Sequence, residues 1–258
     1  MTGVHHPLQQ LTEFSKSSDR RESITGLLIA LSIISIWATS LFFLCSLDLN
    51  QVPEWIIPLA MLWQIFLYTG LFITAHDAMH GAVFPLNPKV NNGIGATVLL
   101  LYGLFSYKKL LKKHWMHHHH PATHLDPDFH DGKHRNPIAW YLYFMKGYWS
   151  WRRLIGLMIV FNVLSLVLHV PDQNMILFWV LPSILSSVQL FFFGTFLPHR
   201  EPKTGYSSTH RATTYALPPL WSFIACYHFG YHEEHHEHPN VPWWRLPEVY
   251  KVRSASLV

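Results

Sequence analysis

Charged residues and cysteines are both scarce in this sequence. Asp, Glu, Lys and Arg make up only 13% of the 258 residues, whereas hydrophobic residues make up 50%. A typical soluble domain has about 25% charged residues. The two cysteines, Cys45 and Cys226, fit neither a disulfide framework nor a zinc site built from thiolates. The composition therefore predicts an integral membrane protein.

Long apolar runs account for this composition. Four of them predict membrane-spanning helices, which pair into two hairpins: 24–47, 55–74, 154–168 and 175–197. The apolar stretch 94–107 is shorter and bracketed by lysines, so we expect it to dip into the membrane or lie along it. The stretch 216–226 is broken by two prolines and predicts an interfacial helix. Beyond it, we expect Trp243 and Trp244 to lie at the level of the lipid headgroups.

The basic residues define an orientation. All nineteen Lys and Arg residues fall outside 22–88 and 154–199, which hold the four predicted spans and both hairpin turns. Cytoplasmic loops carry the excess of positive charge. We therefore expect both termini, including the polar segment 1–23, on the cytoplasmic side of one membrane domain, 1–258. Because topology explains the net charge of +4, no nucleic-acid partner is expected.

Histidine is abundant, with twenty residues, and its spacing is regular. The pattern H-x-x-H-H-x-H-P occurs at 114–121 and again at 232–239, and a smaller pair, His76 and His80, is spaced i, i+4. On a helix, residues at i, i+3 and i+4 share a face, so we expect each long box to present three imidazoles to one point. These three histidine boxes predict a metal site on the cytoplasmic side.

The number of these histidines indicates two metal ions, because nine imidazoles exceed what one ion accommodates. Eight stand at box positions, and His199 follows the last predicted span. The predicted ligands are His76, His80, His114, His117, His118, His199, His232, His235 and His236. Six other histidines outside the boxes follow no ligand spacing and are expected to be solvated or structural: His5, His6, His130, His134, His169 and His210.

Two other functions remain open at this point. The third box also contains H-E-x-x-H, which would make Glu233 the general base of an intramembrane zinc protease with His232 and His236 as ligands. A histidine-rich metal carrier is the non-enzymatic alternative. Neither explains why separate apolar segments deliver histidines to the same side. A redox centre of two metals would suit the oxidation of an apolar substrate taken from the lipid.

The sequence resembles the membrane fatty-acid desaturase and hydroxylase superfamily, which has histidine boxes of these types. Within it, the stretches 76–81, 193–200 and 227–247 are similar to the beta-carotene ketolases. This resemblance implies an all-α membrane protein with a non-haem diiron centre that oxidises the C4 methylene of a beta-ionone ring to a ketone. It further implies O2 as co-substrate, a carotenoid taken from the bilayer, and electrons from reduced ferredoxin. A carotenoid hydroxylase or an acyl-lipid desaturase could use the same centre.

The resemblance also implies roles for individual residues. The family's ligands fall on the eight box histidines, and the additional ligand falls on His199, with His228 as second choice. His120 and His238 would orient ligands or bond to the backbone. Five further side chains are candidates to accept hydrogen bonds from metal-bound histidines: Asp77, Asp126, Asp128, Glu233 and Asn240.

Overall fold

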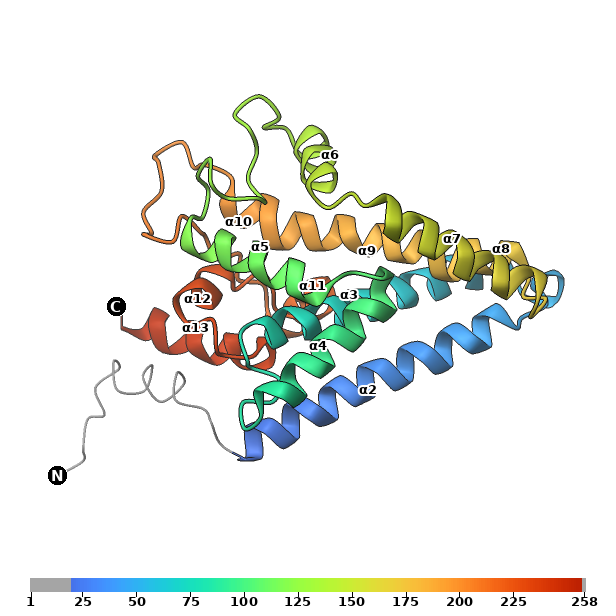
Figure 1. The fold of residues 1–258 in the computed structure, drawn as a ribbon. Helices are drawn as coiled ribbons and strands as arrows, with labels where there is room; N and C mark the ends of the chain where they lie inside the picture. Colours follow the sequence, from blue (N-terminus) through green and yellow to red (C-terminus); the bar gives the residue numbers. More distant parts are fainter. Residues whose placement is uncertain (1–19, 257–258) are drawn as a thin grey trace.

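The computed structural model of the protein describes residues 20–256, and it is helical without a strand in that range. Helix α2 (Arg20–Cys45) and helix α3 (Ile56–Met79) form an antiparallel hairpin (Figure 1). Both helices are long and apolar enough to cross a bilayer. The predictions of spans at 24–47 and 55–74 are thus confirmed to that extent. Much of the segment 1–23 lies outside the described residues.

Helix α3 changes character along its length. Its first half exposes large apolar side chains such as Leu59 and Leu62, whereas Leu71, Ile73 and Ala75 are completely buried. In the buried half, Tyr68 packs edge-on against Trp37 of α2, with ring centroids 5.5 Å apart. The second half of α3 is therefore the centre of the helix bundle.

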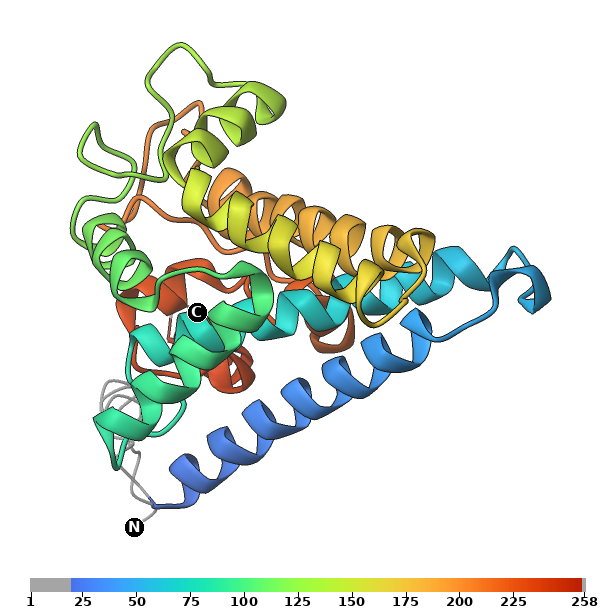
Figure 2. The ribbon, with the colours of Figure 1, turned by 45° about the vertical axis from the view of Figure 1, so that its right-hand side comes forward.

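Helix α4 (Pro88–Gly103) and helix α5 (Tyr107–His119) are bent by 101° relative to each other. Leu104, which ends α4, adopts a left-handed conformation with φ 56°, and this turns the chain. Helix α4 runs beside α3, while α5 crosses the end of the bundle (Figures 1 and 2). This geometry is that of a broken span or a re-entrant pair, as expected for a stretch that enters the membrane without a simple crossing.

Two further helices lead back through the molecule. After helix α6 (Pro137–Gly147), helix α7 (Trp151–Leu166) runs antiparallel to a continuous helix, Asp172–His199, that comprises α8, α9 and α10. The long helix can span a bilayer. Helix α7, with 16 residues, is about 24 Å long and shorter than a hydrocarbon core of about 30 Å. The four-span arrangement accordingly remains a prediction.

The long helix contains two π-helical turns, Ile176–Val180 and Phe192–Phe196. Such turns are rare and frequently lie at functional sites. The second one directly precedes Pro198 and His199, and its Gly194 lies against the ring of Phe229: a Cβ at this position would be 2.1 Å from Phe229 Cε1. Glycine therefore permits the close approach of this helix to the C-terminal part of the chain.

Three short helices complete the fold: α11 (Pro219–Cys226), α12 (His232–Glu237) and α13 (Leu246–Ala255). Leu220 and Trp221 of α11 are exposed, consistent with the predicted interfacial helix. Trp243 does not expose its side chain as an interfacial tryptophan would: it is 9% exposed, stacks on Phe223, and its backbone N–H donates to Asp77 (2.9 Å). Aromatic neighbours on α11 bury this side chain inside the bundle.

Both views show where the ends of the helices meet. The turns that join α2 to α3 and α7 to α8 lie at one end of the molecule, and α5, α10, α12 and α13 lie toward the other (Figures 1 and 2). The histidine boxes are carried by the latter group and by the end of α3. One end of the bundle therefore holds the candidate site.

Candidate metal centre

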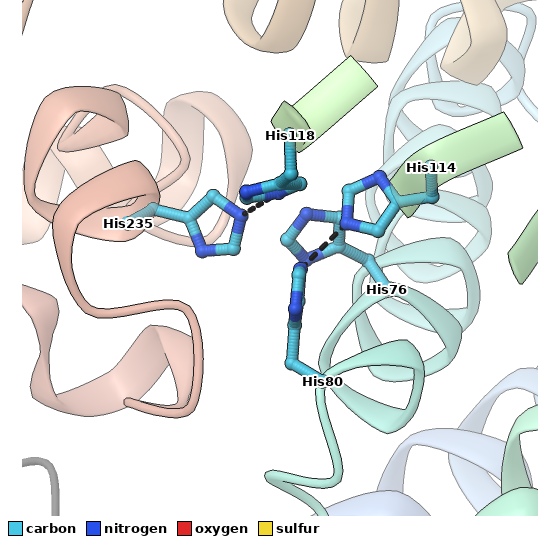
Figure 3. Close-up of side chains that lie close together, drawn as sticks. All are labelled: His76, His80, His114, His118 and His235. Atoms are coloured by element: carbon cyan, nitrogen blue, oxygen red, sulfur yellow. Dashed lines mark hydrogen bonds between the residues drawn. The ribbon is translucent and has the colours of Figure 1, made fainter. Parts of the chain in front are cut away.

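The first histidine cluster joins three helices (Figure 3). His76 and His80 come from the end of α3, His114 and His118 from α5, and His235 from α12, and each offers a nitrogen within 4.8 Å of the others. The Nε2 atoms of His114 and His80 are 2.6 Å apart, and those of His235 and His118 are 3.1 Å apart. Segments far apart in the sequence thus present five nitrogens to one point.

The second cluster contains His117, His199, His232 and His236, all of them buried. The Nε2 atom of His232 lies 3.0 Å from that of His199 and 3.2 Å from that of His236. The Nε2 atoms of His117 and His236 are also 3.2 Å apart. Helices α5, α10 and α12 therefore contribute to a second point of convergence beside the first.

The spacing of these nitrogens fits metal coordination. An imidazole nitrogen lies about 2.1 Å from a bound divalent ion, so two such ligands at a right angle are about 3.0 Å apart. His76 Nε2 is buried and has no hydrogen-bond partner among the described residues, although an unpaired buried nitrogen is costly. Burial, followed by the neighbouring imidazoles, lowers the pKa of His235 well below 6.5. The neutral form that binds metals is therefore favoured.

The expectation that each long box points at one place is wrong. In box 114–118, His114 and His118 belong to the first cluster and His117 to the second. In box 232–236 the assignment is reversed: His235 belongs to the first cluster, and His232 and His236 belong to the second. A residue advances by about 100° around a helix, so the positions i+3 and i+4 diverge. With a separate convergence point on either side, each box divides between two sites.

Hydrogen bonds fix the rings of several of these histidines. His117 Nδ1 lies 3.0 Å from Asp126, and His76 Nδ1 lies 3.3 Å from Asp77. His199 Nδ1 donates to the backbone carbonyl of Arg211 at 2.9 Å, which leaves its Nε2 without the proton. Such outer partners typically orient metal-binding imidazoles. Two carboxylates from the predicted set, Asp77 and Asp126, thus occupy the expected positions.

The electrostatics around Asp126 support this arrangement. Burial acts to raise its pKa, but the facing imidazole of His117 and the backbone N–H groups of Asp128 and Ala122 lower it below the usual value. The N–H groups of Asp128 and Ala122 donate to the carboxylate at 2.8 and 2.9 Å. Asp126 is thereby held as a carboxylate that accepts the Nδ1–H of His117.

The second-choice residues lie elsewhere. His228 is in neither cluster: its ring packs near Phe223 and Trp243, with centroids 5.9 Å away in both cases. His120 is exposed at the end of α5, and His238 follows α12 half-buried. Asn240 is half-buried in the turn beyond. The structure therefore brings all nine first-choice histidines together and leaves these alternatives outside.

The histidines that follow no ligand spacing are outside both clusters where the structure describes them. His134 pairs with Asp131 at 2.9 Å on the surface. His210 comes nearest, with its ring centroid 6.2 Å from that of His236. His5 and His6 fall on residues that the structure does not describe.

The acidic residues of the third box do not face the metal clusters as a zinc protease would require. Glu233 forms an ion pair with Arg253 at 2.5 Å. Glu234, which is 1% exposed, accepts hydrogen bonds from Arg253 (3.0 Å) and from Thr214. These acids tie α12 to α13 and to the preceding loop, and thereby fix the helix that carries three histidines.

An apolar cavity of about 100 Å³ reaches both clusters. His76 and His114 of the first cluster and His117 and His232 of the second lie in its wall. Most of the remaining wall is aromatic or aliphatic, including Phe72, Phe105, Leu110, Phe144, Leu190, Phe191 and Phe229. An apolar molecule in this cavity would lie against imidazoles of both clusters.

Two features of the site have no clear sequence signal. The carbonyl of Arg211 that orients His199 lies in an irregular segment where Arg211 has φ 46°. Glu234 is distinguished from Glu233 only by which side of α12 it occupies. Asp126, in contrast, has a sequence signal, because it is a carboxylate shortly after the second box. In the fold, the chain turns back after this box and brings Asp126 to His117.

The comparisons with known proteins agree with this geometry. The sequence model described as fatty acid desaturase matches residues 52–161 and 144–257. The chain therefore belongs to the fatty acid desaturase family, which confirms the superfamily resemblance.

Among curated proteins, the similar ones are ketolases. A beta-carotene ketolase of Paracoccus sp. (strain N81106 / MBIC 01143) is 44% identical over 229 residues, which cover 87% of this chain and 92% of that protein. A beta-carotene ketolase of Paracoccus sp. (strain PC1) is 40% identical, covering 86% and 94%. A zeaxanthin 4-ketolase of Chlamydomonas reinhardtii is 36% identical, covering 92% and 56%. The resemblance to the ketolase branch is thereby confirmed as well.

Proposed function

We propose that this protein is an oxygen-dependent carotenoid 4-ketolase with two irons held by the nine clustered histidines. The observation that carries the proposal is the apolar cavity whose wall includes imidazoles of both clusters. A beta-ionone ring is a hydrocarbon, so a cavity of this character suits it. The names of the similar proteins support the same substrate class.

The donor set is compatible with iron. Imidazole nitrogen suits iron, zinc, copper and nickel. The oxidation of a methylene group needs a redox-active ion, and this requirement excludes zinc. The first cluster would hold one ion and the second the other. Bound iron would supply the activation of O2, with two electrons per oxidation from a reduced donor such as ferredoxin.

The protein's own residues bind and orient the reactants. The aromatic wall would hold the ring with C4 toward the imidazoles, and the exclusion of water by this wall would limit wasteful reduction of O2. Two successive hydroxylations at C4 followed by loss of water give the ketone. Asp77 and Asp126 would keep His76 and His117 in the orientation that ligation requires.

We further propose the orientation with the histidine clusters on the cytoplasmic side. The two helix turns at the far end of the molecule carry no Lys or Arg, and all nineteen basic residues fall outside the stretches 22–88 and 154–199 that contain these turns. This asymmetry is the pattern of a cytoplasmic face. A soluble electron donor would then reach the site from the cytoplasm.

The alternatives use the same centre on other substrates or other chemistry. A carotenoid hydroxylase would stop at the alcohol, and an acyl-lipid desaturase would oxidise a linear chain. The zinc-protease alternative is disfavoured because Glu233 is paired with Arg253. The ketolase names among the similar proteins favour ketone formation.

The test is pigment analysis of a beta-carotene-producing host that expresses this chain. We expect ketones at C4, and about two irons per purified chain. A matched variant, His235→Ala, should accumulate as membrane protein without producing ketone. Unchanged beta-carotene with a well-folded wild-type protein would refute the substrate assignment, and a single zinc per chain would refute the diiron centre.

A further inference from the structure

We propose that Asp128 holds the alcohol formed at C4 by the first oxidation and so retains it for the second. This inference rests on the proposed function, because only a two-step oxidation at one carbon passes through that alcohol. Each step replaces one C4–H bond by C4–OH, consumes one O2, two electrons and two protons, and releases one water. The resulting diol loses a further water to leave the ketone.

The alcohol intermediate has to stay in the cavity until the second oxidation. Its hydroxyl is a polar group inside a mostly apolar cavity, where an unpaired hydroxyl is disfavoured relative to water. Without a hydrogen-bond partner at the right place, the alcohol would leave before the second oxidation. A ketolase is thus expected to have an acceptor near its metal site, whereas an enzyme that stops at the alcohol does not need one.

Asp128 is placed for this role. It lines the cavity together with His117 and His232, and a carboxylate oxygen lies within 4.8 Å of a ring nitrogen of His117. A hydroxyl formed beside the second cluster would therefore be close to this carboxylate. Among the described residues of the cavity wall, Asp128 is the only one with a carboxylate.

Two other hydroxyl groups in the wall have partners of their own, whereas the hydroxyl of Thr195, which also lines the cavity, is neutral and hence a weaker acceptor than a carboxylate. The hydroxyl of Tyr102 bonds to Ser186 at 2.9 Å, and that of Ser187 donates to the carbonyl of Ile184 at 2.6 Å. Neither is part of the histidine clusters. Asp128 is therefore the strongest acceptor available to a hydroxyl at the reactive end of the cavity.

The surrounding contacts hold Asp128 in position. Its backbone N–H donates to Asp126 at 2.8 Å, and its carbonyl accepts the indole N–H of Trp140 at 2.9 Å. The Tyr148 hydroxyl donates to the Oδ1 atom of the side chain. A carboxylate has about four acceptor sites, so one phenol leaves capacity for a substrate hydroxyl.

The test is the ratio of C4 alcohol to C4 ketone produced by Asp128→Ala in a beta-carotene-producing host. Loss of a hydrogen bond to a charged group should raise this ratio about ten-fold or more, with iron content unchanged. Asp128→Asn keeps an acceptor oxygen, so its ratio should rise by only a few-fold. Asp131→Ala, at an exposed position of the same connector, is the matched control and should leave the ratio unchanged.

The outcomes separate this inference from the proposed function. If the wild type forms no oxidised pigment, the proposed function fails. If Asp128→Ala lowers total oxidation at an unchanged alcohol-to-ketone ratio, Asp128 is only structural and this inference is refuted. Should Asp128→Ala fail to fold, an unchanged ratio in Asp128→Asn would refute it equally.

Discussion

Replacement of His199 by alanine, compared with the same change at His228, tests the assignment of the second cluster. Both histidines are buried and precede or adjoin the third box, but only His199 directs its Nε2 to another cluster nitrogen, 3.0 Å away on His232. His228 instead packs against Trp243. The two substitutions remove the same side chain from similarly buried positions, so each serves as the control for the other.

The expected magnitudes differ. Loss of a side chain that merely supports a metal ligand typically lowers metal affinity about 10- to 100-fold. His199 supplies one of four nitrogens in its cluster, so His199→Ala should exceed that range and abolish ketone formation. For His228→Ala we expect near-normal iron and a modest loss of activity from altered packing.

The assay is iron per chain by elemental analysis after purification in detergent, followed by competition with a chelator. Pigment analysis of the same preparations reports turnover. The reasoning is refuted if His199→Ala keeps two irons while His228→Ala loses one, because the convergence of Nε2 atoms would then not indicate ligation.

Three further predictions follow from the supporting structure. Asp126→Asn should weaken iron binding about 10- to 100-fold, measured by chelator competition, because the carboxylate that accepts the Nδ1–H of His117 would be lost. An iron affinity equal to that of the wild type would contradict this prediction. Gly194→Ala should lower the free energy of unfolding by about 1–3 kcal/mol, measured by thermal unfolding, because the added methyl group would clash with Phe229. Gly205→Ala adds a methyl group in open space at positive φ, so it measures the cost of backbone strain without a clash. Burial lowers the pKa of His235 well below 6.5, so iron in the first cluster should stay bound as pH falls to about 6.5 and be released only in more acidic buffer, as measured by iron content after dialysis; release above that pH would contradict the lowered pKa.

Much of the fold could be predicted because the signals are local. Apolar length alone indicates α2, α3 and the long helix 172–199. The same criterion gives no firm answer for α7, which is too short, or for α4 and α5, whose 101° bend depends on a left-handed residue, Leu104. The burial of Trp243 could not be predicted, because it depends on contacts with α11 that the sequence does not show.

In the candidate site, too, local features could be predicted from the sequence and features that depend on tertiary contacts could not. The eight box histidines were identifiable from their spacing, and His199 because it follows a predicted span as His76 does. The distribution of these histidines between two clusters could not be predicted, because it depends on how α5 and α12 face each other. Aromatic residues near the site illustrate the limit of the sequence: Phe191 and Phe229 line the cavity, whereas the ring of Tyr227 stacks on that of Phe66, with centroids 4.5 Å apart, in the core.

The division of each long box between the clusters would couple the two proposed metal positions mechanically. One turn of α5 and one turn of α12 each carry histidines of both clusters, so a small rotation of either helix would move donors of both sites at once. The first ion to bind would set the rotation of both helices and thereby prepare the second site. Metal uptake is accordingly expected to be cooperative, with little protein carrying a single ion, and the distance between the ions is built into the helical repeat.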